Sequence, residues 1–257
     1  MKSAELWSTE LASWSIPDEI LAQAETSPWI HPAILFQIPE PILMTPSHDV
    51  ALAALPKSGS VLDIGCGGGV AAFALSERAA QVIGVDHQVE MLEMFSANAN
   101  QRGLKSEIHL GFWPAIASKV PIADVVTVHH VLYNVSDVVP FITELNNHAK
   151  KRVVIEIPSL HPLANLSDAW KHFWNLQRPI GPTPELLLKV LSDMGIIANI
   201  EYWSSGIRNE IDFENTAEFM RIRLCLPASR IDEVRSYLLE NPPSGTRELA
   251  TIWWDRM

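Results

Sequence analysis

The feature that most constrains the fold of this chain is a glycine-rich segment at 63–69, which reads Asp-Ile-Gly-Cys-Gly-Gly-Gly. It follows a short apolar run at 61–64, and apolar residues at helical spacing follow it from Val70 onward. Glycines let the backbone turn sharply between two elements and let a ligand lie against bare backbone. Backbone N–H groups at the start of the following helix can hold a polar or anionic group. The segment therefore predicts a strand, a ligand-binding turn and a helix, in that order.

Apolar runs alternate with helical patterns along the rest of the chain. We expect strands at 61–64, 81–86, 108–110, 123–128, 152–157, 197–203 and 249–254. Strands that alternate with helices predict an α/β fold with a parallel sheet covered on both faces. The strands are almost entirely apolar, which agrees with a sheet buried on both sides.

The same patterns divide the chain into segments. Residues 1–57 contain short apolar stretches broken by prolines, which predicts an N-terminal helical arm or lid. We expect the ligand-binding domain at 58–204, a small helical cap at 205–245 and the last sheet strand at 246–257.

Charge and composition limit the partners of the chain. The formal net charge is -11, and the longest cluster of Lys and Arg is the segment 150–152. Nucleic-acid binding depends on basic patches that neutralise phosphate, so we expect no nucleic-acid partner. The N-terminus lacks the apolar core of a signal peptide, and no apolar stretch reaches the length of a membrane span. Together with a cysteine count of only 2, this predicts a cytoplasmic protein with no membrane partner.

The spacing of the glycines distinguishes between two classes of cofactor. A dinucleotide-binding loop places its third small residue where this chain has Val70. The spacing here is instead Asp-x-Gly-x-Gly-x-Gly, on Asp63, Gly65, Gly67 and Gly69. It closely resembles motif I of the class I, Rossmann-like methyltransferases that depend on S-adenosylmethionine (SAM). The resemblance implies a seven-stranded, mostly parallel sheet whose last strand is antiparallel, with helices on both faces.

The resemblance also implies which residues of the loop bind SAM. Gly65 and Gly67 would contact the methionine end of SAM, and Asp63 would help to hold its amino group. His129, at the end of the fourth strand, would border the same methionine moiety. Cys66 lies inside the motif, so we interpret it as a small pocket residue and not as a nucleophile.

The ends of the second and third strands supply the other cofactor residues. Asp86 ends the second strand, where a carboxylate can accept hydrogen bonds from both ribose hydroxyls. The resemblance implies that Asp86 binds the ribose and that His87 lies near the adenine. After the third strand this chain has Phe112 where the family often has an acidic residue. We therefore expect Phe112 to hold the adenine by stacking.

The residues after the fourth strand are the candidates for catalysis. Ligands of this fold bind at the carboxyl ends of the strands, which places His130 and Tyr133 at the pocket. His130 is suited to proton transfer near neutral pH, although both side chains could instead shape the pocket wall or pack the next helix. We expect no metal site, because neighbouring histidines such as His129 and His130 point in opposite directions on an extended chain. The spacings typical of zinc sites are also missing from the sequence.

These observations predict a SAM-dependent methyltransferase that acts on a small molecule. The aromatic stretch at 170–178 suits a planar or apolar acceptor, although the same side chains could pack the arm and cap onto the domain. Two alternatives stay open. One is an NAD(P)-dependent oxidoreductase, which the mismatch at Val70 disfavours. The other is a catalytically silent, methyltransferase-like module that binds a partner.

Overall fold

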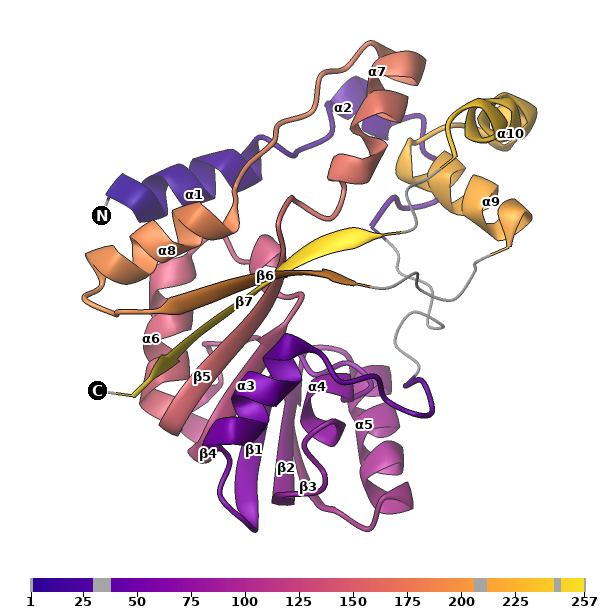
Figure 1. Cartoon of the computed structure of the whole chain (residues 1–257). Helices are drawn as coiled ribbons and strands as arrows, with labels where there is room; N and C mark the ends of the chain where they lie inside the picture. The colour runs from indigo at the N-terminus through magenta and orange to yellow at the C-terminus, as the bar shows by residue number, and fades with distance from the viewer. Residues whose placement is uncertain (1, 30–37, 206–211, 243–245, 257) are drawn as a thin grey trace.

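The chain folds around a seven-stranded sheet with helices on both faces (Figure 1). The computed structural model describes residues 2–29, 38–205, 212–242 and 246–256. The strand order is β3-β2-β1-β4-β5-β7-β6; β7 pairs antiparallel with β5 and β6, and the other neighbours are parallel. The predicted fold class is therefore confirmed. The strands are β1 (Gly59–Ile64), β2 (Ala79–Asp86), β3 (Lys105–Leu110), β4 (Ala123–His129), β5 (Ala149–Pro158), β6 (Asn199–Ser205) and β7 (Arg247–Asp255).

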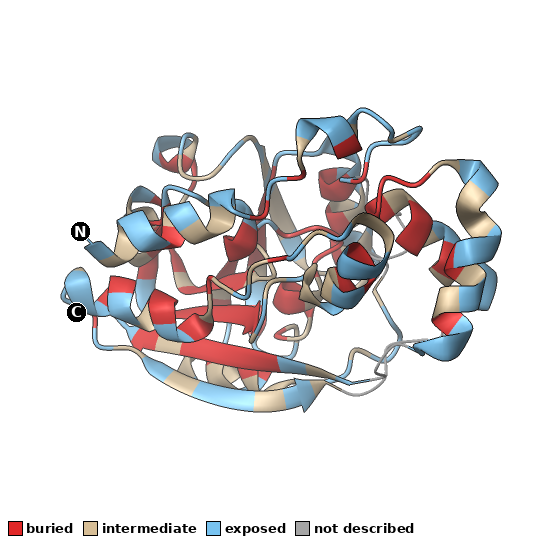
Figure 2. Cartoon of the chain, turned by 90° about the horizontal axis from the view of Figure 1, so that it is seen from above, coloured by how far each residue is buried: buried red, intermediate tan, exposed pale blue. Residues whose placement is uncertain are grey.

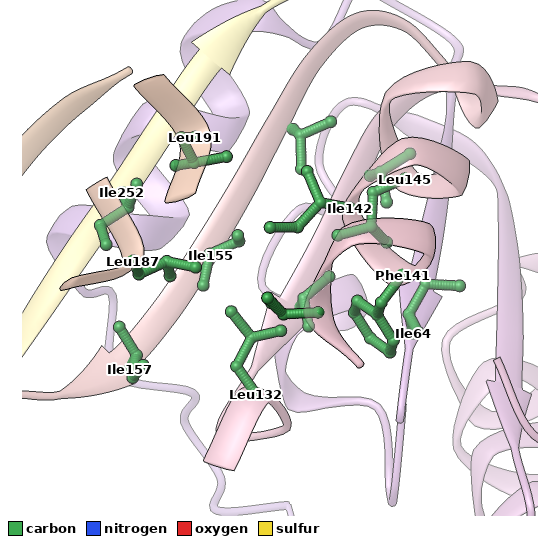
Figure 3. Close-up of a cluster of buried hydrophobic side chains, with 14 of the residues drawn as sticks. Ile64, Leu132, Phe141, Ile142, Leu145, Ile155, Ile157, Leu187, Leu191 and Ile252 are labelled. Atoms are coloured by element: carbon green, nitrogen blue, oxygen red, sulfur yellow. The ribbon is translucent and has the colours of Figure 1, made fainter. Parts of the chain in front are cut away.

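Alternation along the strands assigns each side chain to one of two buried faces. In β5, Val153, Ile155 and Ile157 belong to one core cluster, whereas Val154 belongs to the cluster on the opposite face. This follows from the period of two in a strand, which turns successive side chains to opposite sides. Figure 3 shows part of the first core, with Ile155 beside Leu187. The polar residues of the strands follow the same rule.

Within the described ranges, three helices cover each face of the sheet. The first face is covered by α1 (Lys2–Ala12), α6 (Val138–His148) and α8 (Pro184–Asp193), which share a core with the strands. The second face is covered by α3 (Pro46–Ala54), α4 (Val70–Phe73) and α5 (Val89–Gln101). Both α1 and α3 fall within the segment 1–57, so this segment contributes a helix to each face. Figure 2 shows buried residues on the inner faces of the helices and exposed residues on the outer faces.

A third hydrophobic cluster lies away from the sheet. It joins α2 (Asp18–Leu21) of the arm to α7 (Ser167–Trp174), α9 (Phe213–Arg223) and α10 (Ile231–Glu240), which gather above the sheet in Figure 1. Trp170 is fully buried in this cluster, and the indole of Trp174 donates to the Leu224 carbonyl at 2.7 Å. Trp170 and Trp174 of the aromatic stretch therefore pack α7 against its neighbouring helices, as the alternative interpretation held. Within the described residues, no helix is long and apolar enough to span a bilayer.

A buried arginine ties the arm to the segment that follows α7. Arg178 is 5% exposed; it donates to the Ser15 carbonyl at 3.1 Å and also to the Trp14 carbonyl. Its guanidinium lies 5.2 Å from the ring centroids of both Trp14 and Trp170. Burial lowers the pKa of Arg178 below its ordinary value. The carbonyls and aromatic faces compensate for the loss of water around the cation.

We expect Arg178→Met to lower the free energy of unfolding by about 2 kcal/mol, because it leaves two carbonyls without a donor. Urea denaturation followed by tryptophan fluorescence measures this change. Arg235→Met is the control, since Arg235 makes its ion pairs with Glu214 and Asp232 at the surface. Equal midpoints for the two variants would contradict the role given to Arg178.

Candidate functional site

The glycine loop joins the end of β1 to the start of α4. Gly65, Gly67 and Gly69 adopt φ values of 68°, 51° and 96°, in the left-handed region that favours glycine. A Cβ atom on Gly65 would lie 2.4 Å from a methyl carbon of Val131, which directly follows the two histidines after β4. A side chain therefore does not fit at Gly65, and the loop lies against the segment that carries the catalytic candidates.

Asp63 is a buried carboxyl with one unused oxygen. It is 2% exposed, and its Oδ1 accepts a hydrogen bond from the Thr127 hydroxyl at 3.0 Å. Its Oδ2 is buried and has no hydrogen-bond partner among the described residues. Burial raises the pKa of Asp63 to about 7. A buried polar atom without a partner is unfavourable, so this oxygen is suited to a donor on a ligand.

The raised pKa of Asp63 predicts a pH-dependent stability. The folded chain holds this proton more tightly than the unfolded chain, whose pKa is near 3.8, so stability falls as the pH rises from about 4 to about 7. Asp63→Asn removes that loss. Between about pH 4.5 and pH 7.5, the wild type should lose on the order of 2 kcal/mol of unfolding free energy relative to the Asp63→Asn variant. Urea denaturation of both proteins across this pH range measures the difference in unfolding free energy. A difference that does not change with pH would contradict the raised pKa of Asp63.

Asp86, at the end of β2, lies directly beside the loop. Its Oδ2 accepts from the Gly67 N–H at 3.0 Å, and its Oδ1 accepts from the Gln88 N–H at 3.0 Å. The residue is 8% exposed. Each carboxylate oxygen has a further lone pair, so Asp86 can also accept from two ligand hydroxyls.

An aromatic pair lies next to Asp86. The rings of His87 and Phe112 stack, with centroids 4.8 Å apart and planes 23° apart. Phe112 is 69% exposed, which is unusual for a large apolar side chain. The structure thus brings together two residues that were expected at the adenine, and their rings offer a planar surface. Trp113 instead donates to the Phe141 carbonyl at 3.2 Å and packs against the core.

Cys66 packs inside the loop. Its thiol is buried, and a Cβ atom on Gly84 would lie 3.0 Å from its sulfur. Burial raises the pKa of the Cys66 thiol well above its ordinary value. A protonated, buried thiol is a poor nucleophile, which agrees with the interpretation of Cys66 as a small pocket residue.

The two histidines after β4 converge on one carboxylate. Nε2 of His130 lies 3.0 Å from Oε1 of Glu156, and Nδ1 of His129 lies 3.8 Å from Oε2. The expectation that these side chains point in opposite directions is therefore wrong. His130 has a φ of 61°, so the chain leaves strand geometry there and the period of two no longer applies. Among the described residues, no group of three or more His, Cys, Asp or Glu side chains is placed to hold a metal ion.

Glu156 is the residue of the site that the sequence interpretation missed. It lies in β5, opposite His129 in the register of the two strands, and is 5% exposed. Its oxygens accept from the Thr45 hydroxyl at 3.1 Å and from His130. One feature of the sequence could have revealed it, because Glu156 is the only charged residue in the apolar run 153–158. A charge inside a doubly buried strand needs partners and is often functional.

Tyr133 has a different environment. It is 6% exposed, and its hydroxyl donates to the Pro158 carbonyl at 2.7 Å. Its ring stacks with Trp7 of α1 at 6.0 Å, and burial raises the pKa of its hydroxyl well above the ordinary value. These contacts favour packing over proton transfer, and the catalytic role expected for Tyr133 stays a prediction that the geometry does not support.

Comparison with known proteins agrees with this geometry. A family model described as a methyltransferase domain matches residues 55–195. The ubiquinone biosynthesis O-methyltransferase of Bartonella quintana is 27% identical over 132 residues, which cover 51% of this chain and 53% of that protein. The enzyme of the same name from Psychrobacter arcticus is 38% identical over 80 residues, which cover 30% of this chain and 31% of that protein. The chain thus spans about half or less of the length of these curated relatives.

Solved structures share the fold. The YcgJ protein of Bacillus subtilis superposes with a TM-score of 0.55 and 19% identity, covering 82% of this chain and 97% of that one. A cyclopropane-fatty-acyl-phospholipid synthase-like protein from Lactobacillus casei gives a TM-score of 0.54 and 14% identity, covering 81% and 90%. The family match covers more than half of the chain and includes the glycine loop, the acid after β2 and the histidines after β4. The chain belongs to the methyltransferase-domain family, within the class I, Rossmann-like proteins that depend on SAM.

Proposed function

We propose that this protein transfers a methyl group from SAM to a small-molecule acceptor. One observation carries the proposal: the unpartnered Oδ2 of Asp63 is buried beside a loop whose glycines leave the backbone bare. A ligand with an amino group would complete the hydrogen bonding of that oxygen. The family match decides against the oxidoreductase alternative.

The residues of the site are proposed to bind SAM along its whole length. Asp63 and the loop backbone would hold the methionine end, Asp86 would accept from the ribose hydroxyls, and Phe112 with His87 would stack on the adenine. Bound SAM would supply a methyl group on a sulfonium, which is already an excellent leaving group. The protein would mainly align the acceptor and exclude water.

The acceptor is proposed to be a small molecule. The names of the curated relatives describe O-methyltransferases of ubiquinone biosynthesis, which act within the chemistry of small molecules. The net charge of -11 does not favour a nucleic-acid acceptor. A cytoplasmic location also belongs to the proposal, since Cys66 and Cys225 are both free thiols.

Methyl transfer can be tested without knowing the acceptor. The purified protein is incubated with SAM labelled on its methyl group and with a cell extract separated into metabolites, proteins and nucleic acids. We expect label in the metabolite fraction, and Asp86→Ala should remove it. Label in the protein or nucleic-acid fraction would overturn the proposed acceptor class. If SAM binds but no fraction is labelled, the catalytically silent module becomes the better account.

A further inference from the structure

A buried polar cluster centred on Glu156 lies on one face of the sheet, under α3. Alternation places Asp63, Thr127 and His129 on the same face as Glu156, since Val61, Val125 and Val154 of these strands belong to the core under α3. The helix adds Ser47 and His48, and Thr45 caps its first turn. The cluster therefore continues the polar row that begins at Asp63, and it extends that row toward the carboxyl end of β5.

Glu156 supplies the charge of the cluster. Burial alone would raise its pKa, but the imidazoles of His129 and His130 and the hydroxyl of Ser47 outweigh burial and hold the pKa below its ordinary value. The carboxylate accepts from Thr45 at 3.1 Å and lies 3.0 Å from Nε2 of His130. No Lys or Arg within the described residues makes an ion pair with it. The cluster thus holds a negative charge surrounded by hydroxyls and imidazoles.

Two of the imidazoles are neutral and have unused nitrogens. Burial lowers the pKa of His129 to about 3 and also lowers the pKa of His48. Nδ1 of His48 accepts from the Thr45 N–H at 3.2 Å, so the proton of the neutral ring is on Nε2. Nε2 of His48 and Nε2 of His129 are both buried without a partner in the described chain, and the two rings stack at 5.3 Å.

His130 is the member of the cluster that reaches the surface. Its side chain is 32% exposed, whereas those of His129 and Glu156 are 11% and 6% exposed. Its Nε2 faces the Glu156 carboxylate, which fixes the ring proton on that nitrogen and leaves Nδ1 as an acceptor. That Nδ1 is buried, although part of the ring is exposed, and it has no partner among the described residues. Val131, the next residue, packs on Gly65, so His130 lies next to the cofactor loop.

From this geometry we infer that the cluster binds the reactive group of the acceptor and that this group is a hydroxyl. His130 removes the proton of the hydroxyl, and Glu156 acts as a positioning residue. The inference rests on the proposed methyl transfer. A hydroxyl both accepts and donates, so it can take a hydrogen bond from Nε2 of His48 and give one to Nδ1 of His130. An amine attacks through its lone pair and needs no base before it attacks, whereas a hydroxyl must lose its proton as the new bond forms.

The transfer step balances with these groups. The O–H bond breaks and its proton moves to Nδ1 of His130, while the oxygen forms a bond to the methyl carbon. The bond between that carbon and sulfur breaks, and its electron pair remains on sulfur. The resulting imidazolium is stabilised by the Glu156 carboxylate at 3.0 Å, as in other base–carboxylate pairs. Nδ1 of His130 is buried when no acceptor is bound, so the proton passes to water that enters as the methylated product leaves.

Histidine-ring ¹⁵N spectra test this inference on the whole protein saturated with S-adenosylhomocysteine. Phenol is the probe, and anisole, which lacks the O–H, is the matched control. We expect phenol to shift the His130 and His48 ring nitrogens and anisole to shift neither, with His172 of α7 as the unaffected reference. Equal shifts from both compounds, or none from phenol, would overturn the inference. Failure of S-adenosylhomocysteine to bind would instead contradict the proposed function.

Two variants distinguish a role of Glu156 in positioning His130 from a role in the stability of the fold. In Glu156→Gln the affinity for phenol, read on the His48 ring, should fall at least about fivefold with an unchanged unfolding midpoint, because the charge that polarises His130 is gone. Glu201→Gln, on the exposed side of β6, should keep the wild-type affinity. If Glu156→Gln does not fold, His130→Asn gives the same test against His172→Asn. If the folded variant, Glu156→Gln or His130→Asn, binds phenol with the affinity of the wild type, the roles assigned to Glu156 and His130 are refuted.

Discussion

Replacing Asp86 with alanine is expected to lower the affinity for SAM by at least about 100-fold. The carboxylate would accept charge-assisted hydrogen bonds from the ribose hydroxyls, and each such bond contributes about 1.5–3 kcal/mol. Asp86 also holds the Gly67 N–H at 3.0 Å, so the variant loosens the loop as well as losing the ribose contact. A calorimetric titration of the variant with SAM measures the loss.

Asp124 supplies a matched control for that experiment. It also accepts two hydrogen bonds, from the backbone N–H and the hydroxyl of Ser60, both at 2.9 Å. It lies near the amino end of β4, at the opposite end of the sheet from the glycine loop. Asp124→Ala should therefore lower stability and leave SAM affinity within about twofold. If both variants lost SAM binding equally, the effect would be general destabilisation and not contact with the ribose.

Replacing Gly69 with valine is expected to lower the free energy of unfolding by about 4 kcal/mol. Gly69 has a φ of 96°, which a β-branched residue adopts only under strain. Its new Cβ would lie 2.2 Å from a ring carbon of Phe73 and 2.8 Å from one of Phe95, both of which are buried. Strain of about 1–3 kcal/mol and overpacking of similar size add here. Thermal and urea unfolding measure the change.

A valine substitution at Gly195 separates the cost of backbone strain from the cost of overpacking. It has a φ of 78°, but a Cβ there would meet nothing within 4 Å. Gly195→Val should therefore show only the backbone strain, about half of the loss expected at Gly69. If the two valine variants were equally stable, the packing of Gly69 against the two phenylalanines would have no energetic role.

The parts of the fold that depend on local patterns could be predicted from the sequence. The five inner strands follow from apolar runs whose length and composition suit a sheet buried on both faces, whereas the edge strands β3 and β6 are partly exposed. The structure differs from the seven expected ranges only at their ends. The loop at 63–69 was predictable because glycines at left-handed positions constrain the backbone locally.

The parts that depend on long-range packing could not be predicted. Glu156 and His48 meet His129 only because β4 and β5 are neighbours and α3 lies over them, which no spacing in the chain reveals. The turn of His130 toward Glu156 depends on a left-handed φ in a residue that is not glycine, which the sequence pattern gave no reason to expect. Arg178 and Trp170 looked like pocket residues because their type suits a ligand. Trp170 instead packs against α9 and α10, and Arg178 binds backbone carbonyls that follow α1.

The central claim is that the ends of β1 and β2 form a SAM site, and one calorimetric experiment tests it most directly. The purified protein is titrated with SAM, with NAD and with NADP under the same conditions. The account predicts binding of SAM that Asp86→Ala removes and Asp124→Ala retains, with no heat from either dinucleotide. Binding of NAD or NADP without binding of SAM would contradict it.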